Sequence, residues 1–482
     1  MTAEGETNTA KGPHTGLAIA TFVLIAALHF LLLTRGTGDI LGPEMLSGSF
    51  DSLAQSFLRG SAEVDPDAIR WEAFVVDGRA YMYFGPWPAL LRLPLVLIAP
   101  GLAGEWARLS CFVASLLCLA AFGTLVRAML AKNPYLEAEH RSFLLVTSLV
   151  GFGVASPLLF LMNAASIYHE SIVWALAGSL CFSAIAVPRL GRVEALESKL
   201  LLLSFIAGAT LLARVTYAGP LYLVLLFIGF RAMKNGTGAP RIVMLLLPAG
   251  VMLLFQLWYN AARFGSPLTF VDYSLMGFMR ADPTTLEVLD RTGDFSLTRV
   301  FVALGNYFVP GSGQVSGAFP WFRLAPPAYP DAGLYPRIFT SWVMPLSLIA
   351  SWLVLAGSMG LGLLLHDRTQ RFAQACFFAF GLQALLVCAY YIMELRYEID
   401  LLPLFVLGFA VFVARLGAPG VLVSRVQDVL TALLFTVALS AIVATSTTLS
   451  AIPVGGPAHP KAYKALWQDK FDAINRVLPG HD

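Results

Sequence analysis

Long apolar stretches alternate with polar segments along most of the chain. A helix that crosses the ~30 Å hydrocarbon core of a bilayer needs about 20 predominantly apolar residues. The stretches that reach or approach this length are 17–34, 88–103, 106–127, 142–162, 167–187, 200–213, 216–230, 242–260, 340–365, 372–393, 401–417 and 426–450. The pattern predicts an all-α polytopic membrane protein with about 11–13 transmembrane helices. It excludes an outer-membrane barrel, whose strands alternate apolar and polar residues.

The polar segments divide these predicted spans into groups. We expect a cytoplasmic tail at 1–16, a first transmembrane helix at 17–34 that is retained rather than cleaved as a signal peptide, a first long loop at 35–87, a transmembrane core at 88–260, a second long loop at 261–339, C-terminal transmembrane helices at 340–450 and a short polar tail at 451–482. Lys and Arg cluster in the short loops 127–141, 189–199, 231–241, 366–371 and 415–425. Since such clusters mark the cytoplasmic side, both long loops and the C-terminal tail should face outward.

Two places do not fit a simple series of crossings. Residues 88–127 look like two spans, yet the charge bias allows one crossing there, so Pro88–Gly101 is either short or re-entrant. Residues 200–230 would be about 46 Å long as one helix, which is too long for one span and too short for two ideal ones. Arg214 at its centre marks either the turn between two short helices or a side chain that reaches the interface by snorkelling.

Composition agrees with the membrane prediction. Of the 482 residues, 57% are hydrophobic and only 13% are charged, whereas soluble domains carry about 25% charged residues. The net charge of +2 leaves no basic footprint for a nucleic-acid partner, so the lipid bilayer is the expected surrounding. The five cysteines lie inside apolar stretches without metal-ligand spacing, which is typical of small core residues.

Polar residues gather at the ends of the predicted spans that share the outer side, where ionisable groups are expensive and usually functional. In the first long loop, apolar residues within 50–58 recur at helical spacing, so Asp51 should begin a short amphipathic helix on the membrane surface. There Asp51 is either a carboxylate that stabilises the helix N-terminus or a general base. Trp87, between two prolines, suits the membrane interface, and Arg92 lies one turn further inside.

Later segments supply a carboxylate and two guanidinium groups. Glu170 follows His169 after an apolar stretch, but adjacent helical side chains point in different directions, so the two do not form a metal pair by themselves. Arg214 and Arg396 fall at the outer boundary, and a guanidinium binds two phosphate oxygens at once. The two arginines could therefore clamp a lipid phosphate, or Arg396 could simply pair with Glu394 or Glu398 in a solvated turn.

The segments FDSLAQSFLRG, DGRAYMYFGPWPALLRLP, YHESIVWALAG, ARVTY, WYNAARFGSPL and ELRYEIDLLPL occur in this order from the first long loop to about residue 403. Together they resemble the GT-C superfamily of membrane glycosyltransferases, especially bacterial relatives of protein O-mannosyltransferases and aminoarabinose transferases. The resemblance implies a GT-C bundle in the bacterial cytoplasmic (inner) membrane. It also implies an inverting transfer of a hexosyl or pentosyl group from a polyprenyl-phosphate-linked donor to a hydroxyl of a glycan, lipid or protein at the outer face.

The resemblance also suggests roles for individual residues. Asp51 matches an acidic residue that acts as base or binds a metal, and Glu170, beside His169, matches a second acidic residue that is commonly Asp in the relatives. A divalent cation held by Asp51 and Glu170 is therefore one alternative, and a reaction without a cofactor is the other. The remaining candidates are Arg214, Arg396, Tyr397 and Arg92 for the donor phosphate, and Tyr83, Trp87, Tyr168, Tyr217 and Asn260 for the substrates.

A transporter or flippase for a lipid-linked or anionic substrate is the alternative function, since broken helices and membrane arginines occur there too. Transporters place their charges near the midplane, whereas these charges crowd one face. A cavity at the outer face lined by Asp51, Glu170, Arg214 and Arg396 would favour the transferase, and a central pore would favour transport.

Overall fold

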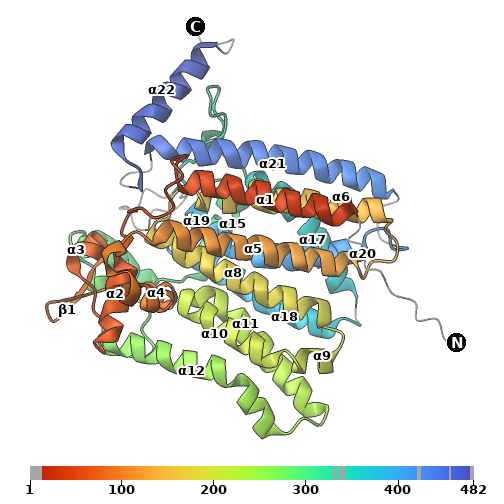
Figure 1. Ribbon diagram of the computed structural model, residues 1–482, viewed down its shortest axis with the longest axis horizontal. Helices are drawn as coiled ribbons and strands as arrows, with labels where there is room; N and C mark the ends of the chain where they lie inside the picture. Colours follow the sequence, from red (N-terminus) through yellow and green to blue (C-terminus); the bar gives the residue numbers. More distant parts are fainter. Residues whose placement is uncertain are drawn as a thin grey trace.

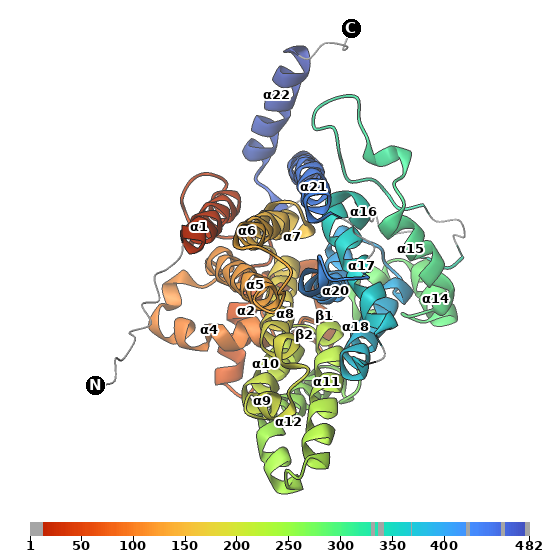
Figure 2. The ribbon, with the colours of Figure 1, turned by 90° about the vertical axis from the view of Figure 1, so that its right-hand side faces the viewer.

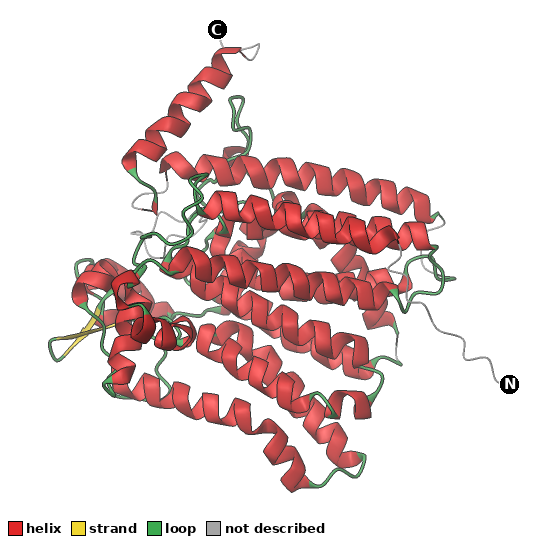
Figure 3. Ribbon diagram, viewed as in Figure 1, coloured by secondary structure: helices red, strands yellow, loops and turns green. Residues whose placement is uncertain are grey.

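The computed structural model describes residues 13–328, 333–335, 342–367, 369–420, 425–454 and 458–477. Most of these residues lie in helices that run side by side (Figure 1, Figure 3). The strands among them are β1 (Phe74–Val76) and β2 (Arg79–Tyr81), an antiparallel hairpin in the first long loop. The all-α polytopic fold expected from the apolar pattern is therefore confirmed.

The bundle is built from helices that are long and apolar enough to cross a membrane. They are formed by α1 (Pro13–Leu33), α5 (Ala107–Leu130), α8 (Ile167–Ala186), α11 (Val215–Lys234), α12 (Ala239–Phe264), α18 (Arg371–Ala389), α21 (Val426–Val454) and the continuous helical segment Leu395–Arg415, which ends in α20 (Leu402–Arg415). The shorter helices α6 (Ala138–Val154), α10 (Leu200–Ala213) and α17 (Ser351–His366) run alongside them (Figure 1).

Short elements gather at one end of the bundle, which we call the loop end (Figure 1). This end includes α2 (Gly48–Leu58), α3 (Pro66–Ile69) and the β1–β2 hairpin of the first long loop. Other short helices among the described residues are α7 (Pro157–Leu161), α9 (Val193–Glu197), α13 (Gly277–Arg280), α14 (Pro283–Thr292), α15 (Val300–Phe308), α16 (Leu346–Ile349), α19 (Leu395–Glu398) and α22 (Lys461–Val477). Of these, α22 extends away from the bundle (Figure 2).

The structure shows how the chain folds at both irregular places in the apolar pattern. Helix α4 (Trp87–Ile98) has 12 residues and is therefore about 18 Å long, too short to cross a bilayer. It lies across the loop end, seen end-on in Figure 1 and lengthwise in Figure 2. Residues 88–103 thus do not form the expected span, and within 88–130 the helix long and apolar enough to cross is Ala107–Leu130.

The second irregular place is a turn between two short helices. Arg214 separates α10 from α11 with an extended backbone (φ −162°, ψ 119°). The two helices pack against each other and against neighbouring bundle helices. Of the two alternatives for Arg214, the turn is therefore correct. The predicted span 340–365 differs as well, because the backbone breaks at Ala350 and divides the segment between α16 and α17.

Glycines bring α17 and α20 into close contact. A Cβ atom added to Gly360 would overlap the carbonyl oxygen of Gly408, and one added to Gly408 would overlap the carbonyl oxygen of Gly357. Where lipid surrounds a bundle, small residues let helix backbones approach and gain van der Waals contact. This contact positions α20 and, through it, the polar segment that precedes α20 at the loop end.

Replacing Gly360 with alanine should therefore lower the thermal unfolding midpoint of the purified protein in detergent. Overpacking of a close contact costs about 1–3 kcal/mol, because the backbones must separate. Gly362→Ala on the same helix is the matched control, since a Cβ there would meet no atom within 4 Å. Equal midpoints for the two variants would contradict the close α17–α20 contact.

Candidate active site at the loop end

An apolar cavity of about 260 Å³ opens at the loop end, and we call it the arginine cavity. Arg214 from the α10–α11 turn and Arg396 from α19 contribute its guanidinium groups. Gly85 lets the first long loop pass close to this turn, because a Cβ there would overlap the carbonyl oxygens that end α10. The tyrosines of the wall are Tyr83, Tyr168, Tyr273, Tyr390 and Tyr397.

Each of the two arginines has one carboxylate partner and remains accessible. Arg214 Nε lies 3.1 Å from Asp400 Oδ2, and its guanidinium sits 5.2 Å from the Tyr397 ring. Arg396 pairs with Glu394 and stands 4.3 Å from the Tyr168 ring. The exposed fractions of the two arginine side chains are 21% and 20%. Neither arginine side chain is completely buried, and both line the arginine cavity.

A second cluster, which we call the carboxylate cluster, is closed. Arg92 Nη2 donates to both carboxylate oxygens of Glu170, at 2.9 and 2.8 Å, and Arg92 Nη1 lies 3.4 Å from Asp51 Oδ2. No side chain of the three is more than 2% exposed. The backbone N–H of Gly104 also donates to Asp51 Oδ2 at 3.1 Å. The guanidinium of Arg92 is thus used by two carboxylates and does not face the arginine cavity.

Asp51 keeps one oxygen free for chemistry. It lies in the first turn of α2, as the spacing of apolar residues predicts. Its Oδ1 has no hydrogen-bond partner among the described residues, and the residue lines a neighbouring cavity of about 590 Å³. Burial raises the pKa of Asp51, against the opposing charge of Arg92. A carboxylate with a raised pKa and one oxygen without a hydrogen-bond partner is suited to accept a proton.

The sequence-based expectation placed Asp51, Glu170, Arg214 and Arg396 around one chamber. That expectation of one shared chamber is wrong: the two arginines line one cavity, Asp51 lines another, and Glu170 lines neither of these two. Helix α8 connects the groups, because Tyr168 and Ser171 line the arginine cavity on either side of Glu170. An acceptor held near Asp51 would have to reach across this helix end.

The carboxylate cluster does not fit a shared divalent ion. Such ions take about six or more oxygen ligands, which carboxylates and water supply at about 2.0–2.6 Å from the ion. The Arg92 guanidinium instead occupies the space between Asp51 and Glu170. Within the part of the chain that the structure describes, no group of three or more His, Cys, Asp or Glu side chains could hold a metal ion. We therefore assign no step of the chemistry to a metal at these two residues.

Two other predicted site residues, His169 and Asn260, contact neighbouring protein groups outside the arginine cavity. His169 Nδ1 lies 2.7 Å from the carbonyl oxygen of Ala164, and the residue lines a third cavity rather than facing Glu170. Asn260 accepts from Gln256 and Arg263 through one oxygen and donates to a backbone carbonyl through its nitrogen. These contacts leave His169 and Asn260 outside the arginine cavity.

Two aromatic candidates are likewise part of the packing. Trp87 opens α4 and packs edge-on against Trp174 and Phe205. Tyr217 is fully buried on α11 and does not line the arginine cavity. By contrast, Tyr83 and Tyr168 do line it, beside Arg396 and Tyr397.

Two acidic residues near the arginine cavity, Asp400 and Glu72, have partners that the sequence does not predict. Asp400 holds Arg214, and a signal for it existed, because an acidic residue beside an apolar stretch usually has a basic partner. Glu72 accepts a hydrogen bond of 2.5 Å from the Tyr168 hydroxyl. Nothing in the sequence distinguishes Glu72 from the other acidic residues of the first long loop.

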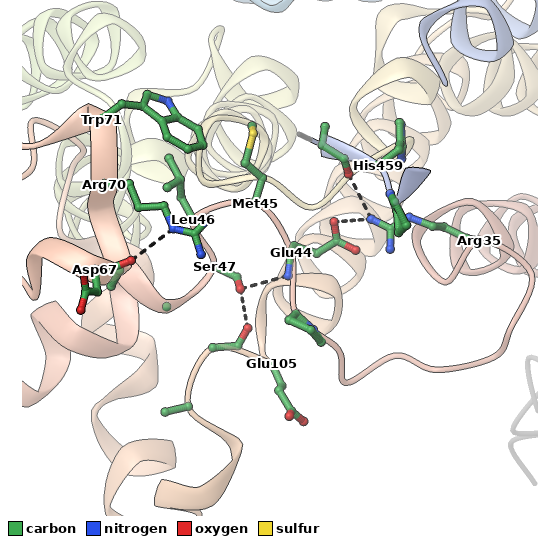
Figure 4. Close-up of a pocket in the computed structure, with 17 residues that line it drawn as sticks. Arg35, Glu44, Met45, Leu46, Ser47, Asp67, Arg70, Trp71, Glu105 and His459 are labelled. Carbon is green, nitrogen blue, oxygen red and sulfur yellow. Dashed lines mark hydrogen bonds and ion pairs between the residues drawn. The ribbon is translucent and has the colours of Figure 1, made fainter. Parts of the chain in front are cut away.

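A further polar cavity of about 480 Å³ adjoins that of Asp51 and shares Gly48 and Gly104 with it. Figure 4 shows its charged wall, where Arg35 reaches Glu44 from one side and Trp71 stands on the other. Cavities with charged groups and an indole ring can bind a hydroxylated, polar molecule. The cavities next to Asp51 are therefore lined by charged and polar groups, whereas the arginine cavity is largely apolar.

Replacing Tyr168 with phenylalanine should reduce stability in a pH-dependent way. Burial raises the pKa of Glu72, and the Tyr168 hydroxyl and Arg396 oppose that rise. Because the folded state then holds the proton to higher pH than the unfolded state, stability falls as pH rises through the raised pKa. Without the hydroxyl the pKa rises further, so the thermal midpoint should drop more at about pH 8 than at about pH 5.

The matched control for this substitution is Tyr135→Phe, in a loop between α5 and α6, where the residue is 51% exposed. It should leave the midpoint unchanged at both pH values. An equal loss at both values in the Tyr168 variant would mean that the hydroxyl does not act through the Glu72 carboxylate.

Comparisons with known proteins identify the fold. No family model and no curated protein matches the chain. The apo oligosaccharyltransferase of Archaeoglobus fulgidus covers 97% of this chain at 12% identity, with a TM-score of 0.50, and the match spans 60% of that enzyme. The structure of ArnT from Cupriavidus metallidurans bound to undecaprenyl phosphate is 14% identical to this chain, with a TM-score of 0.43. The match covers 96% of this chain and 78% of the ArnT chain. At 12% identity the first likeness shows the fold alone: this chain shares the helical membrane fold of that oligosaccharyltransferase.

Proposed function

We propose that this protein is a membrane glycosyltransferase that moves a sugar from a polyprenyl-phosphate donor to a hydroxyl acceptor. The observation that carries the proposal is the pair of accessible guanidinium groups, Arg214 and Arg396, in an apolar cavity at one end of a membrane bundle. A phosphate joined to an isoprenoid chain needs both features, because its head is anionic and its tail is apolar. The fold, shared with an oligosaccharyltransferase, supports the same class of reaction.

The loop end should face the outside of the bacterial cytoplasmic membrane. Basic residues stand near the helix ends opposite it, at Arg127, Arg189, Arg231 and Arg415. Such residues favour the cytoplasmic side. The charged pairs of the protein's interior lie instead at the loop end, which favours a transferase over a transporter with charges along its pathway.

In the proposed reaction Arg214 and Arg396 hold the donor phosphate. As the bond between the sugar C1 and the phosphate oxygen breaks, the oxygen leaves with the electron pair, and negative charge grows on the phosphate. Positive groups already in place stabilise this charge, and they act more strongly where water is excluded. Tyr397 lies beside both guanidinium groups and keeps them aligned toward the cavity.

Asp51 is the proposed general base. Its free Oδ1 would take the proton of the acceptor hydroxyl while the acceptor oxygen forms the new bond to C1. Attack opposite the departing phosphate inverts the anomeric centre. The raised pKa makes Asp51 a stronger base than an ordinary carboxylate. The polar cavities beside it suit an acceptor that carries hydroxyl groups, whether glycan, lipid or protein.

Arg214→Ala and Arg396→Ala should each weaken binding of a polyprenyl phosphate by about tenfold to a hundredfold, because a hydrogen bond to a charged group contributes about 1.5–3 kcal/mol. Binding of the lipid phosphate to the purified protein measures this. Arg241→Ala is the control, since Arg241 is 66% exposed and pairs with Glu197 away from the cavity. Unchanged affinity in both cavity variants would refute the phosphate clamp.

Asp51→Asn should lower turnover with a lipid-linked sugar donor by about 10²–10⁴-fold, while affinity for the lipid phosphate stays the same. In the wild type, kcat/KM should fall as pH falls through the raised pKa of Asp51, because the base must be deprotonated. Glu63→Gln is the matched control, since Glu63 lines the same cavity and pairs with Arg79. Full turnover in the Asp51 variant would remove Asp51 from the role of base.

A further inference from the structure

Arg92 holds an unusual position between two carboxylates from distant parts of the chain. Asp51 comes from α2 and Glu170 from α8, and Arg92 from α4 lies between them. The guanidinium also sits 5.3 Å from the Phe50 ring and 3.4 Å from the Ser47 carbonyl oxygen. The three charged side chains are almost completely buried. Two carboxylates in such surroundings need a cation between them, and the chain itself supplies it.

A metal ion and a guanidinium make different demands on this space. A divalent ion would sit at about 2.0–2.6 Å from the carboxylate oxygens. Arg92 Nη2 and Nη1 already reach those oxygens, at 2.8–2.9 Å for Glu170 and 3.4 Å for Asp51. An ion and the guanidinium therefore cannot occupy the cluster together. The resemblance noted in the sequence allows a divalent cation at these two residues, and the geometry disagrees with it.

We propose that Arg92 is the resident cation of the carboxylate cluster, so that the native protein binds no divalent metal between Asp51 and Glu170. Arg92 neutralises part of their charge and fixes the Asp51 carboxylate through Oδ2, while Oδ1 has no hydrogen-bond partner among the described residues. It is a positioning residue, because it acts on a substrate only through Asp51. The link to a base rests on the proposed function, whereas the absence of a metal site does not.

Removal of Arg92 should convert the cluster into a metal site. In Arg92→Ala the two carboxylates remain, and a space the size of the lost guanidinium opens between them. Carboxylate oxygens and water are suitable ligands for Mn²⁺. The variant should therefore acquire a Mn²⁺ site that the wild type lacks. Arg92→Lys keeps a positive charge in place and should not acquire it.

The experiment is a Mn²⁺ titration of the purified, chelator-treated full chain in detergent, with free Mn²⁺ followed by electron paramagnetic resonance. Wild type and Arg92→Lys should bind no Mn²⁺ above the level seen with Asp51→Asn. Arg92→Ala should bind about one equivalent, and Mn²⁺ should raise its thermal midpoint, since a ligand that binds only the folded state stabilises it. Arg92→Ala/Glu170→Gln should lose this site.

Arg108→Ala is the matched control. Arg108 is also a buried arginine that pairs with a carboxylate, Glu44, but Arg35 remains on that carboxylate after the change. No Mn²⁺ site should therefore appear. A site in this variant would show that loss of any buried arginine creates metal binding, and it would overturn the specific claim for Arg92.

Two results would overturn the proposal directly. One is a Mn²⁺ site in the wild type that Asp51→Asn or Glu170→Gln abolishes. The other is a folded Arg92→Ala that gains no site. If Arg92→Ala does not fold, the Mn²⁺ titrations of the wild type and of Arg92→Lys still test whether the native cluster binds a metal ion. The Mn²⁺ titration uses no sugar donor and is independent of the proposed transferase activity. If Arg214→Ala bound the lipid phosphate as tightly as the wild type, the transferase proposal would fail, but the Mn²⁺ result would still hold.

Discussion

The pairing of buried guanidinium groups with carboxylates at one end of an apolar bundle is the interaction on which the rest of this structure depends. A charge in low-dielectric surroundings is unfavourable unless an opposite charge lies beside it. Arg92 pairs with Asp51 and Glu170. Arg214 and Arg396 each pair with one acidic residue of the segment that precedes α20. These pairs tie together the first long loop, α4, α8, the α10–α11 turn and α20. The loop end thus has a defined arrangement although its elements are short.

The arginine side chains differ in how far their carboxylate partners cover them, and this difference separates the closed carboxylate cluster from the open arginine cavity. Arg92 is 2% exposed and has two carboxylate partners, so its charge is already used. Arg214 and Arg396 keep about a fifth of their side chains exposed, with one carboxylate partner each. A closed cluster gives rigidity and holds Asp51, whereas open pairs leave capacity for an anionic ligand. Both types of pair lie within one end of the same bundle.

Backbone features allow these side chains to meet. Helix α4 is too short to cross a bilayer, and it lies across the bundle, where Arg92 can enter the space between α2 and α8. Gly85 lets the loop before it pass against the end of α10. The extended backbone at Arg214 turns its side chain into a cavity at the loop end. Close packing of α17 on α20 then fixes the segment that carries Arg396.

The sequence by itself determined the membrane bundle, since long apolar stretches can satisfy their backbone hydrogen bonds in lipid only as helices. It also predicted a short helix around Asp51, although that helix begins at Gly48. It left Arg214 either between two short helices or snorkelling, and it made Arg214 and Arg396 candidates for one anion site. Only the tertiary structure decided that Arg92 lies between Asp51 and Glu170, that Glu72 pairs with Tyr168, and that His169 faces elsewhere. Sequence spacing reports which face of one helix a residue occupies. Which charge from a distant helix neutralises it depends on how the helices pack, and residues 78 positions apart, as Arg92 and Glu170 are, carry no local signal of that contact.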